Sequence, residues 1–306
     1  MMRLAGGLLA ACISSLALAG EPAEDPGLTA EQVVEKNVTA RGGLDAWRKV
    51  RTMIWTGHIE STHAPVPSLP FVLELKRPDK MRFEVKAQGQ DSVRIYDGAR
   101  GWKLSTTSSG RPEILPYTRE ELRFAQDGQG IEGSLMDYRA KGTAVSLDGV
   151  DEVEGRKAYR LRLVLPSGAI RHVWVDAKTF LELKYDREAR NALGQSATVA
   201  VFYRDYRAVE GLQIPFLMET MPASAPAGTR PDRMMIDRVV LNPPLGDVAF
   251  AKPGVPGRRN GVPVDIRPPS GGMQPNQGLP PGFPRLNRAG PPALGASAPP
   301  GGATVH

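Results

Sequence analysis

The sequence lacks most of the features that mark familiar protein classes. It has a single cysteine, Cys12, which excludes an internal disulfide framework and a cysteine-rich zinc site. Its one extended apolar stretch, residues 4–19, is too short and too close to the N-terminus to span a bilayer as a mature helix, which excludes a polytopic membrane protein. Aromatic residues make up only 6% of the 306 residues, but a hydrophobic fraction of 41% is enough to bury a core.

Motifs for catalysis and for metal binding are also missing. His58 and His63 lie five residues apart on an extended stretch, which places them on opposite faces. No G-x-S-x-G elbow is present, and the paired acids are adjacent in sequence rather than facing. Residues 128–133 spell G-x-G-x-x-G, but they follow a helical pattern rather than a strand, so we interpret them as a flexible connection. We therefore expect no metal, no cofactor and no enzymatic activity.

The N-terminus has the pattern of an export signal. A short positive segment with Arg3 precedes the apolar stretch, and Ala17-Leu18-Ala19 matches an A-x-A cleavage site. We predict a signal peptide over residues 1–19 and a mature protein that works outside the cytoplasm. An alternative stays open, because Leu9-Ala10-Ala11-Cys12 has the spelling of a lipoprotein cleavage site that would anchor the protein through Cys12.

The net charge of +6 is concentrated at the ends of the chain. Residues 253–306 hold five arginines against one acid, and Arg3 adds one more charge, which leaves +1 on residues 20–252. A body this close to neutral has no phosphate-tracking surface, so we expect no nucleic acid as a partner. The same 54 C-terminal residues include 13 prolines and 11 glycines, and we predict that they form a disordered tail.

Residues 20–252 show the two-residue period of β-strands, after a helical start. Thr29 and Gln32 form a capping box ahead of a helix that ends at Gly42-Gly43, and a short second helix follows around residues 44–47. A second cap signal at Thr118 predicts one or two short helices over residues 118–139. Alternation of apolar and polar residues predicts about eleven strands. They lie around residues 53–59, 71–75, 83–85, 93–95, 102–104, 159–165, 170–176, 181–185, 199–203, 212–218 and 239–241.

Turn residues join these strands closely, so neighbours should be antiparallel. A single sheet of about eleven strands with one apolar face must curl to cover that face. The predicted fold class is therefore mainly β with flanking helices, an antiparallel half-barrel closed by short helices.

Several segments resemble a known family. They are residues 40–47 (ARGGLDAW), residues 175–179 (VDAKT), residues 211–215 (GLQIP) and residues 239–244 (VVLNPP) ahead of Phe250. Their order is similar to that of the LolA/LolB-like superfamily of periplasmic outer-membrane lipoprotein-sorting proteins, over nearly all of residues 29–253. The resemblance implies an eleven-stranded half-barrel with a hydrophobic cavity for acyl chains.

A carrier of this kind needs an apolar interior and no covalent chemistry. The candidates for its lining lie on the predicted concave faces: Trp55, Phe71, Leu73, Phe83, Val85, Trp102, Leu161, Leu163, Phe216 and Met218. We expect a lipid or lipoprotein acyl chain as ligand, with an envelope membrane protein as a further partner. Two other interpretations stay open: a sensor of envelope lipids with the same fold, and a scaffold whose interior is filled by its own side chains.

Overall fold

The computed structural model describes residues 27–61, 66–87, 91–106, 112–128, 130–190 and 196–253. The expected signal peptide lies outside these ranges, and so does the expected tail beyond Pro253. No helix within the described ranges is long and apolar enough to cross a membrane.

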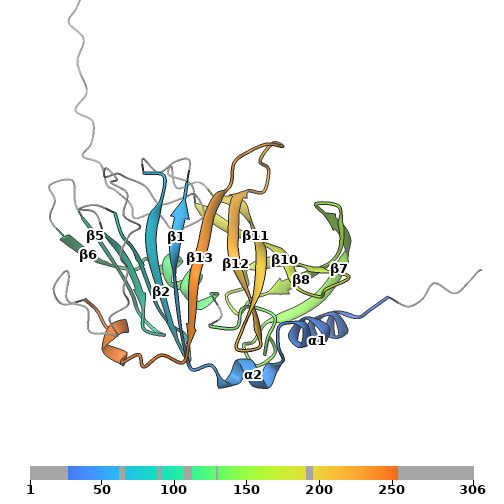
Figure 1. Cartoon of the computed structure of the whole chain (residues 1–306), viewed down its shortest axis with the longest axis horizontal. Coiled ribbons are helices and arrows are strands. Elements are labelled where there is room, and N and C mark those ends of the chain that lie inside the picture. Colours follow the sequence, from blue (N-terminus) through green and yellow to red (C-terminus); the bar gives the residue numbers. More distant parts are fainter. Residues whose placement is uncertain are drawn as a thin grey trace, which may run out of the picture.

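The described residues form one antiparallel sheet of thirteen strands. The strand order is β6-β5-β4-β3-β2-β1-β13-β12-β11-β10-β9-β8-β7. The strands are β1 Thr52–Glu60, β2 Leu69–Lys76, β3 Lys80–Val85, β4 Ser92–Tyr96, β5 Gly101–Thr106, β6 Pro112–Pro116, β7 Ala144–Val153, β8 Arg156–Val164, β9 Ile170–Asp176, β10 Glu182–Arg190, β11 Ser196–Val209, β12 Leu212–Pro222 and β13 Asp232–Leu241. The sheet curves but does not close, because β6 and β7 remain its two edges (Figure 1).

The predicted fold class is confirmed, with two strands more than expected. All eleven predicted strands are present, and the additional ones are the edge strands β6 and β7. We call β1–β6 the N-terminal wing and β7–β13 the C-terminal wing. The wings meet in mid-sheet, where β1 pairs with β13.

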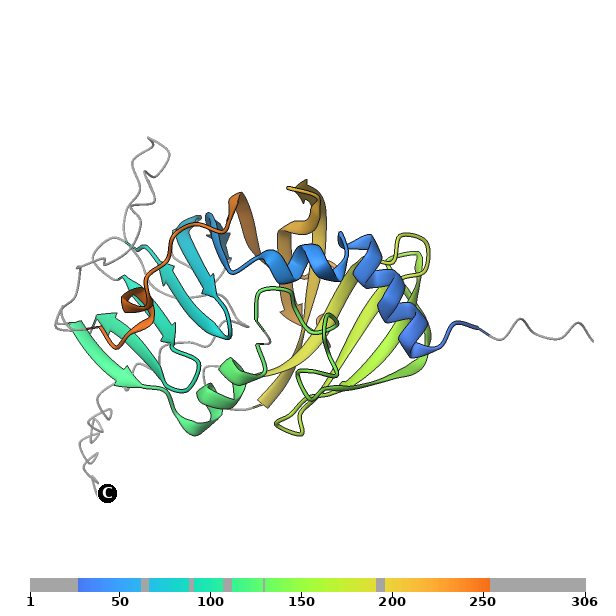
Figure 2. The ribbon, with the colours of Figure 1, turned by 90° about the horizontal axis from the view of Figure 1, so that it is seen from below.

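Helices cover one face of the sheet, which we call the inner face. Helix α1 (Ala30–Ala40) starts at the predicted capping box of Thr29 and Gln32, and Val33 packs with the inner-face residues of the C-terminal wing. Helix α2 (Leu44–Lys49) places Trp47 over the junction of the wings. In Figure 2, which is seen from below, α1 crosses in front of the strands of the C-terminal wing.

The chain crosses between the two edges of the sheet through residues 117–143. Helix α3 (Arg119–Gln126) begins at the second predicted capping box, formed by Thr118 and Glu121. Of the one or two helices expected in this region, α3 is the one formed within the described residues: residues 130–142 are built mainly of turns, from which Leu135 and Met136 are buried in the core. In Figure 2 the green helix α3 lies between the two wings.

The outer face is covered at one end by the last part of the described chain. The 3-10 helix η1 (Asp247–Phe250) buries Phe250 against outer-face residues of the N-terminal wing. The sheet is therefore covered on both faces near β4 and β5.

Candidate functional site

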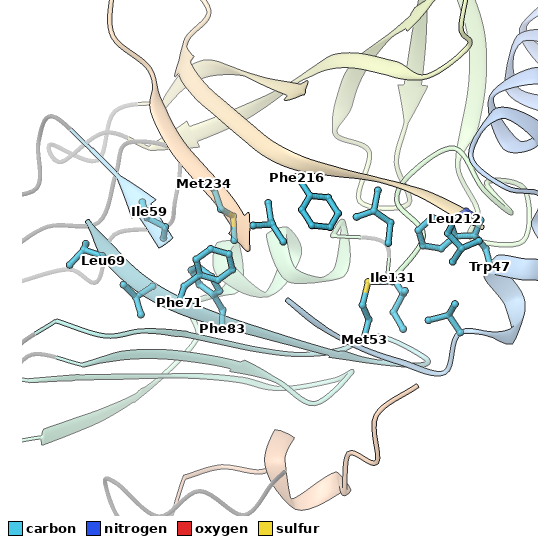
Figure 3. Close-up of a cluster of buried hydrophobic side chains, with 14 of the residues drawn as sticks. Trp47, Met53, Ile59, Leu69, Phe71, Phe83, Ile131, Leu212, Phe216 and Met234 are labelled. Carbon is cyan, nitrogen blue, oxygen red and sulfur yellow. The ribbon is translucent and has the colours of Figure 1, made fainter. Parts of the chain in front are cut away.

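The inner face at the junction of the wings is a continuous apolar surface built from cross-strand rungs. Side chains two residues apart on a strand share a face, so paired residues form rows across several strands. Three rows cross the seam between β1 and β13: Phe83–Leu73–Trp55–Val239, Met81–Leu75–Met53–Leu241, and Leu69–Ile59–Met234–Met218. Figure 3 shows residues of both wings converging on the space between them.

A glycine lets the centre of this surface pack closely. Gly57 lies at an irregularity in the pairing of β1 with β13. A Cβ added to Gly57 would lie 2.0 Å from the carbonyl oxygen of Met235 and 2.9 Å from the ring of Phe71. The Phe71 ring, itself 5.8 Å from the ring of Phe83, therefore occupies the place of a side chain at this position.

The apolar surface is only partly covered. Many of its residues are buried, but the apolar side chains that pack against it are only partly buried, and seven of these lie on strands β1, β2, β3, β12 and β13. They are Trp55, Leu73, Leu75, Met81, Met218, Val239 and Leu241, and we call them the central band. They come from β1, β2, β3, β12 and β13, so the band extends over both wings. Clustered apolar side chains that remain open to solvent at the centre of a concave face are typical of a surface that takes up an apolar ligand.

The structure brings nine of the ten predicted lining residues to the inner face. Six of them belong to the surface at the junction: Trp55, Leu73 and Met218 in the central band, with Phe71, Phe83 and Phe216 buried around it. Val85 is buried in the same cluster. Leu161 and Leu163 lie farther along the C-terminal wing in a separate cluster, where α1 covers them fully.

The prediction for Trp102 is wrong, because this residue lies on the outer face. Phe83 on β3 pairs with Arg94 on β4, so Ile95 points to the opposite side, and Ile95 pairs with Trp102. Trp102 packs there with Phe250 of η1. The alternating pattern marks one apolar face per strand, but it does not say which face of the curved sheet that is.

On β4 and β5 the apolar side chains lie on the outer face, and the inner face carries charged residues. Arg94 and Lys103 are buried on β4 and β5, and both contact Glu121 of α3. The Glu121 carboxylate lies 2.9 Å from Nζ of Lys103 and 3.3 Å from Nη1 of Arg94. Burial opposes its ionisation, but the Thr118 amide and these two cations hold the pKa of Glu121 below its ordinary value. Helix α3 is thus attached to the N-terminal wing by charge.

The attachment of α3 to the C-terminal wing is weaker. The Arg187 guanidinium of β10 lies over the Phe124 ring, 5.1 Å from its centroid. After the helix, Oγ of Ser167 donates a hydrogen bond of 2.8 Å to Asp127. No side chain of α3 itself is fully buried. Helix α3 therefore bridges the wings with polar and aromatic contacts and adds little to the apolar core.

A buried ion pair fixes the end of α1 to the C-terminal wing. Arg41 and Glu182 lie 3.3 Å apart, and the Arg41 guanidinium also stacks on Trp47, 4.6 Å from the ring centroid. The hydroxyl of Tyr206 donates to the Glu182 carboxylate at 3.2 Å. Burial raises the pKa of the Tyr206 hydroxyl well above its ordinary value, and the negative charge of Glu182 adds to this, so the hydroxyl stays protonated. These contacts hold one side of the apolar surface in place.

The G-x-G-x-x-G segment serves as a structural connection. It follows α3, not a strand, and Ile131 enters the apolar surface at the junction. The buried carboxylate of Glu132 lies 2.6 Å from Arg77 and 2.7 Å from Lys141. The part of this segment after Gln129 is thus anchored by packing and by ion pairs.

No group of three or more metal-binding side chains occurs among the residues that the structure describes. His58 lies 3.5 Å from Asp237, His172 lies 2.8 Å from Asp186, and His63 falls outside the described ranges.

Sequence reasoning missed two sets of inner-face residues. Leu75, Met81, Val239 and Leu241 complete the central band. The strands of Leu75, Val239 and Leu241 were predicted without a role in the site, and Met81 lies just before the strand predicted over residues 83–85. Arg171 and Arg187 also point to the inner face, because they lie two residues from the directly paired Val173 and Tyr185. An arginine at an inward position of an apolar strand was the signal that could have revealed them.

No protein-family model matches the chain, and no curated protein matches it in sequence. Its structure is similar to that of a LolA superfamily protein from Nitrosomonas europaea, with a TM-score of 0.47 and 13% identity over 74% of this chain and 99% of that one. It is also similar to a DUF1329 family protein from Desulfovibrio piger, with a TM-score of 0.45 and 12% identity over 72% of this chain and 97% of that one. An outer membrane lipoprotein-sorting protein domain from Vibrio parahaemolyticus has a TM-score of 0.45 and 10% identity over 72% of this chain and 95% of that one.

Proposed function

We propose that the protein binds the acyl chain of a lipid or lipoprotein on its inner face, without covalent chemistry. The observation that carries this proposal is the central band, seven apolar side chains that pack on the core and stay half-buried. Their contribution from five strands gives a surface long enough to follow an extended chain. Its concave setting distinguishes it from scattered apolar residues on an ordinary surface.

The energetics favour an acyl chain as occupant. Each methylene group that leaves water gains ~0.8 kcal/mol, so a chain of about sixteen carbons gains on the order of 10 kcal/mol before the costs of ordering. The half-buried side chains of the band would lose their remaining contact with water at the same time. Methionine at two places in the band, Met81 and Met218, suits a ligand without fixed shape, because its side chain is flexible and polarizable.

We place this activity outside the cytoplasm. The proposed organisation is an export signal over residues 1–19, the sheet domain over residues 20–252 and the proline- and glycine-rich tail over residues 253–306. A lipid that must cross an aqueous compartment needs a protein that shields its acyl chain from water. A curved sheet with one apolar face can provide this shielding.

The first test is native mass spectrometry of the exported protein purified without detergent, with extraction of whatever co-purifies. A stoichiometric lipid supports the proposal. A bare mass, together with no uptake of a fluorescent fatty acid, would contradict it and leave a scaffold with a filled interior.

A matched pair of variants locates the binding surface. Met218 and Leu217 are neighbours on β12, both half-buried, and they point to opposite faces. Met218→Glu should abolish uptake of the fluorescent fatty acid because a carboxylate in the central band must be desolvated when a chain binds. Leu217→Glu should leave uptake unchanged. Equal effects of the two substitutions would show that the inner face is not the site.

A further inference from the structure

On β9 and β10 the inner face carries two arginines at one side of the apolar surface. Arg171 on β9 and Arg187 on β10 lie on adjacent strands, two residues beyond the directly paired Val173 and Tyr185. The Arg171 guanidinium lies 5.3 Å from the centroid of the Tyr185 ring, and Arg187 lies over Phe124 of α3. Two arginines, a tyrosine and the bridging helix thus meet at one place.

These two arginines differ from the other cations of the inner face. Arg41, Arg94 and Lys103 each lie within 3.3 Å of a carboxylate oxygen. Within the described ranges, Arg171 and Arg187 have aromatic contacts but no ion pair with a carboxylate. Two like charges side by side without a counter-charge are unfavourable, the more so where water is partly excluded.

The surroundings of Arg187 show this directly. Burial lowers the pKa of its guanidinium below the ordinary value. The Tyr185 hydroxyl, which is hydrogen-bonded to Arg187, opposes this shift, and the positive charge of Arg171 adds to it. The guanidinium group remains protonated at neutral pH in either case. An anion placed between the two side chains would therefore relieve both the desolvation and the repulsion.

An aromatic path joins this position to the central band. The rings of Tyr185 and Tyr203 lie 5.5 Å apart, and Tyr203 pairs directly with Met218 of the band. A molecule with one charged end and one apolar chain would match this order of surfaces: arginines, then tyrosines, then the apolar side chains. Guanidinium groups prefer oxyanions, to which they donate several hydrogen bonds at once.

We infer that Arg171 and Arg187 bind the oxyanion headgroup, a carboxylate or phosphate, of an amphiphile whose acyl chain lies on the central band. This inference rests on the proposed function and deepens it, since it names the ligand class as anionic single-headed lipids. Phe124 of helix α3, which contacts the Arg187 guanidinium, would then border the headgroup.

The test compares two probes that differ only in the headgroup. The fluorescent fatty acid cis-parinaric acid carries a carboxylate, and its methyl ester has the same chain without the charge. The wild-type protein should bind the acid about 10- to 100-fold more tightly than the ester, the range expected for charge-assisted hydrogen bonds. Arg171→Gln and Arg187→Gln should each reduce the affinity for the acid and leave the affinity for the ester unchanged. Arg238→Gln, an equal loss of charge at an exposed position on β13, should change neither.

The possible results separate this inference from the proposed function. Equal affinity of the wild-type protein for acid and ester overturns the headgroup site and leaves the acyl-chain surface intact. Binding of neither probe, with Met218→Glu identical to the wild type, overturns both. Binding of inorganic phosphate at the arginines without preference for the acid would also overturn it, because the site would then take a free anion. If a glutamine variant does not fold, the comparison of acid and ester on the wild-type protein still decides the question.

Discussion

Removing the carboxylate of Glu121 should release helix α3 from the N-terminal wing. The side chains of Arg94 and Lys103 are 5% and 6% exposed, and that of Glu121 is 16% exposed. In Glu121→Gln the two cations lose their shared counter-charge. Breaking a buried pair from one side costs about 3–5 kcal/mol, because the remaining charge stays desolvated. Nε and Nη2 of Arg94 already lack hydrogen-bond partners among the described residues.

The lost ion pairs should loosen helix α3 itself before they lower the stability of the whole sheet. Helix α3 has no fully buried side chain of its own, so undocking exposes Arg94 and Lys103 to water at little cost in apolar contacts. Hydrogen–deuterium exchange of the α3 amides should therefore quicken by about 100-fold or more, the factor that corresponds to roughly 3 kcal/mol. The rest of the sheet should keep its protection. Glu113→Gln on edge strand β6, which is exposed, is the matched control and should not alter α3.

The same attachment should depend on pH with a defined sign. The pKa of Glu121 is held below its ordinary value in the folded protein, so its contribution is fully present above the unfolded-state pKa of about 4.3 and is lost as the pH falls through the lower, folded value. Exchange of α3 should thus be insensitive to pH between neutrality and about pH 5, after correction for intrinsic rates, and increase in more acidic solution. If α3 in Glu121→Gln exchanges as slowly as in the wild type, the reasoning about its attachment is refuted.

Three further predictions concern the core and the two faces. Arg41→Met should lower the free energy of unfolding by about 3–5 kcal/mol in urea titrations, because Glu182 is left buried without its cation; a loss below about 1 kcal/mol would contradict this. Brominated fatty acids should quench tryptophan fluorescence through Trp55 of the central band, so Trp55→Phe should reduce the quenching. Trp174→Phe on the outer face should leave the quenching unchanged. If Trp174→Phe reduces the quenching and Trp55→Phe does not, the ligand lies elsewhere. Trp102→Ala should cost about 3–5 kcal/mol of stability but leave fatty-acid uptake unchanged, and loss of uptake in a folded variant would return this residue to the binding surface.

The strands that could be predicted from sequence are those with one apolar face. Strands β1 to β5 and β8 to β13 each alternate, because the apolar side of every strand packs against a core. Both faces of β4 are buried, but its inner face carries Arg94, which keeps the alternation. The two that were missed are edge strands, and most of the β7 side chains are exposed, including Val150. An edge strand pairs on one side only and needs no apolar face, so its sequence carries little periodic signal.

The proposed binding surface was harder to predict than the fold, for a geometric reason. Periodicity groups residues by face within one strand, but the hairpin register decides which faces of neighbouring strands coincide. Between β3 and β4 the apolar set changes from inner to outer, which is why Trp102 was misplaced. The arginine pair of the inner face also depends on strand register and could not be predicted from periodicity. Only the pairing of Val173 with Tyr185 brings Arg171 and Arg187 together.

The pairing of β1 with β13 has a consequence for the order in which the molecule can assemble. The first and last strands form the seam beneath the central band, so the two ends of the described sheet must meet before that surface exists. A chain emerging vectorially from a ribosome or a translocation pore can form hairpins within each wing, but it cannot complete the ligand surface until residue 241 has been delivered. Contacts between such distant segments are the slow ones in folding. A chain still in transit would therefore be unable to pick up lipid prematurely, and the ability to bind would arrive together with the last strand.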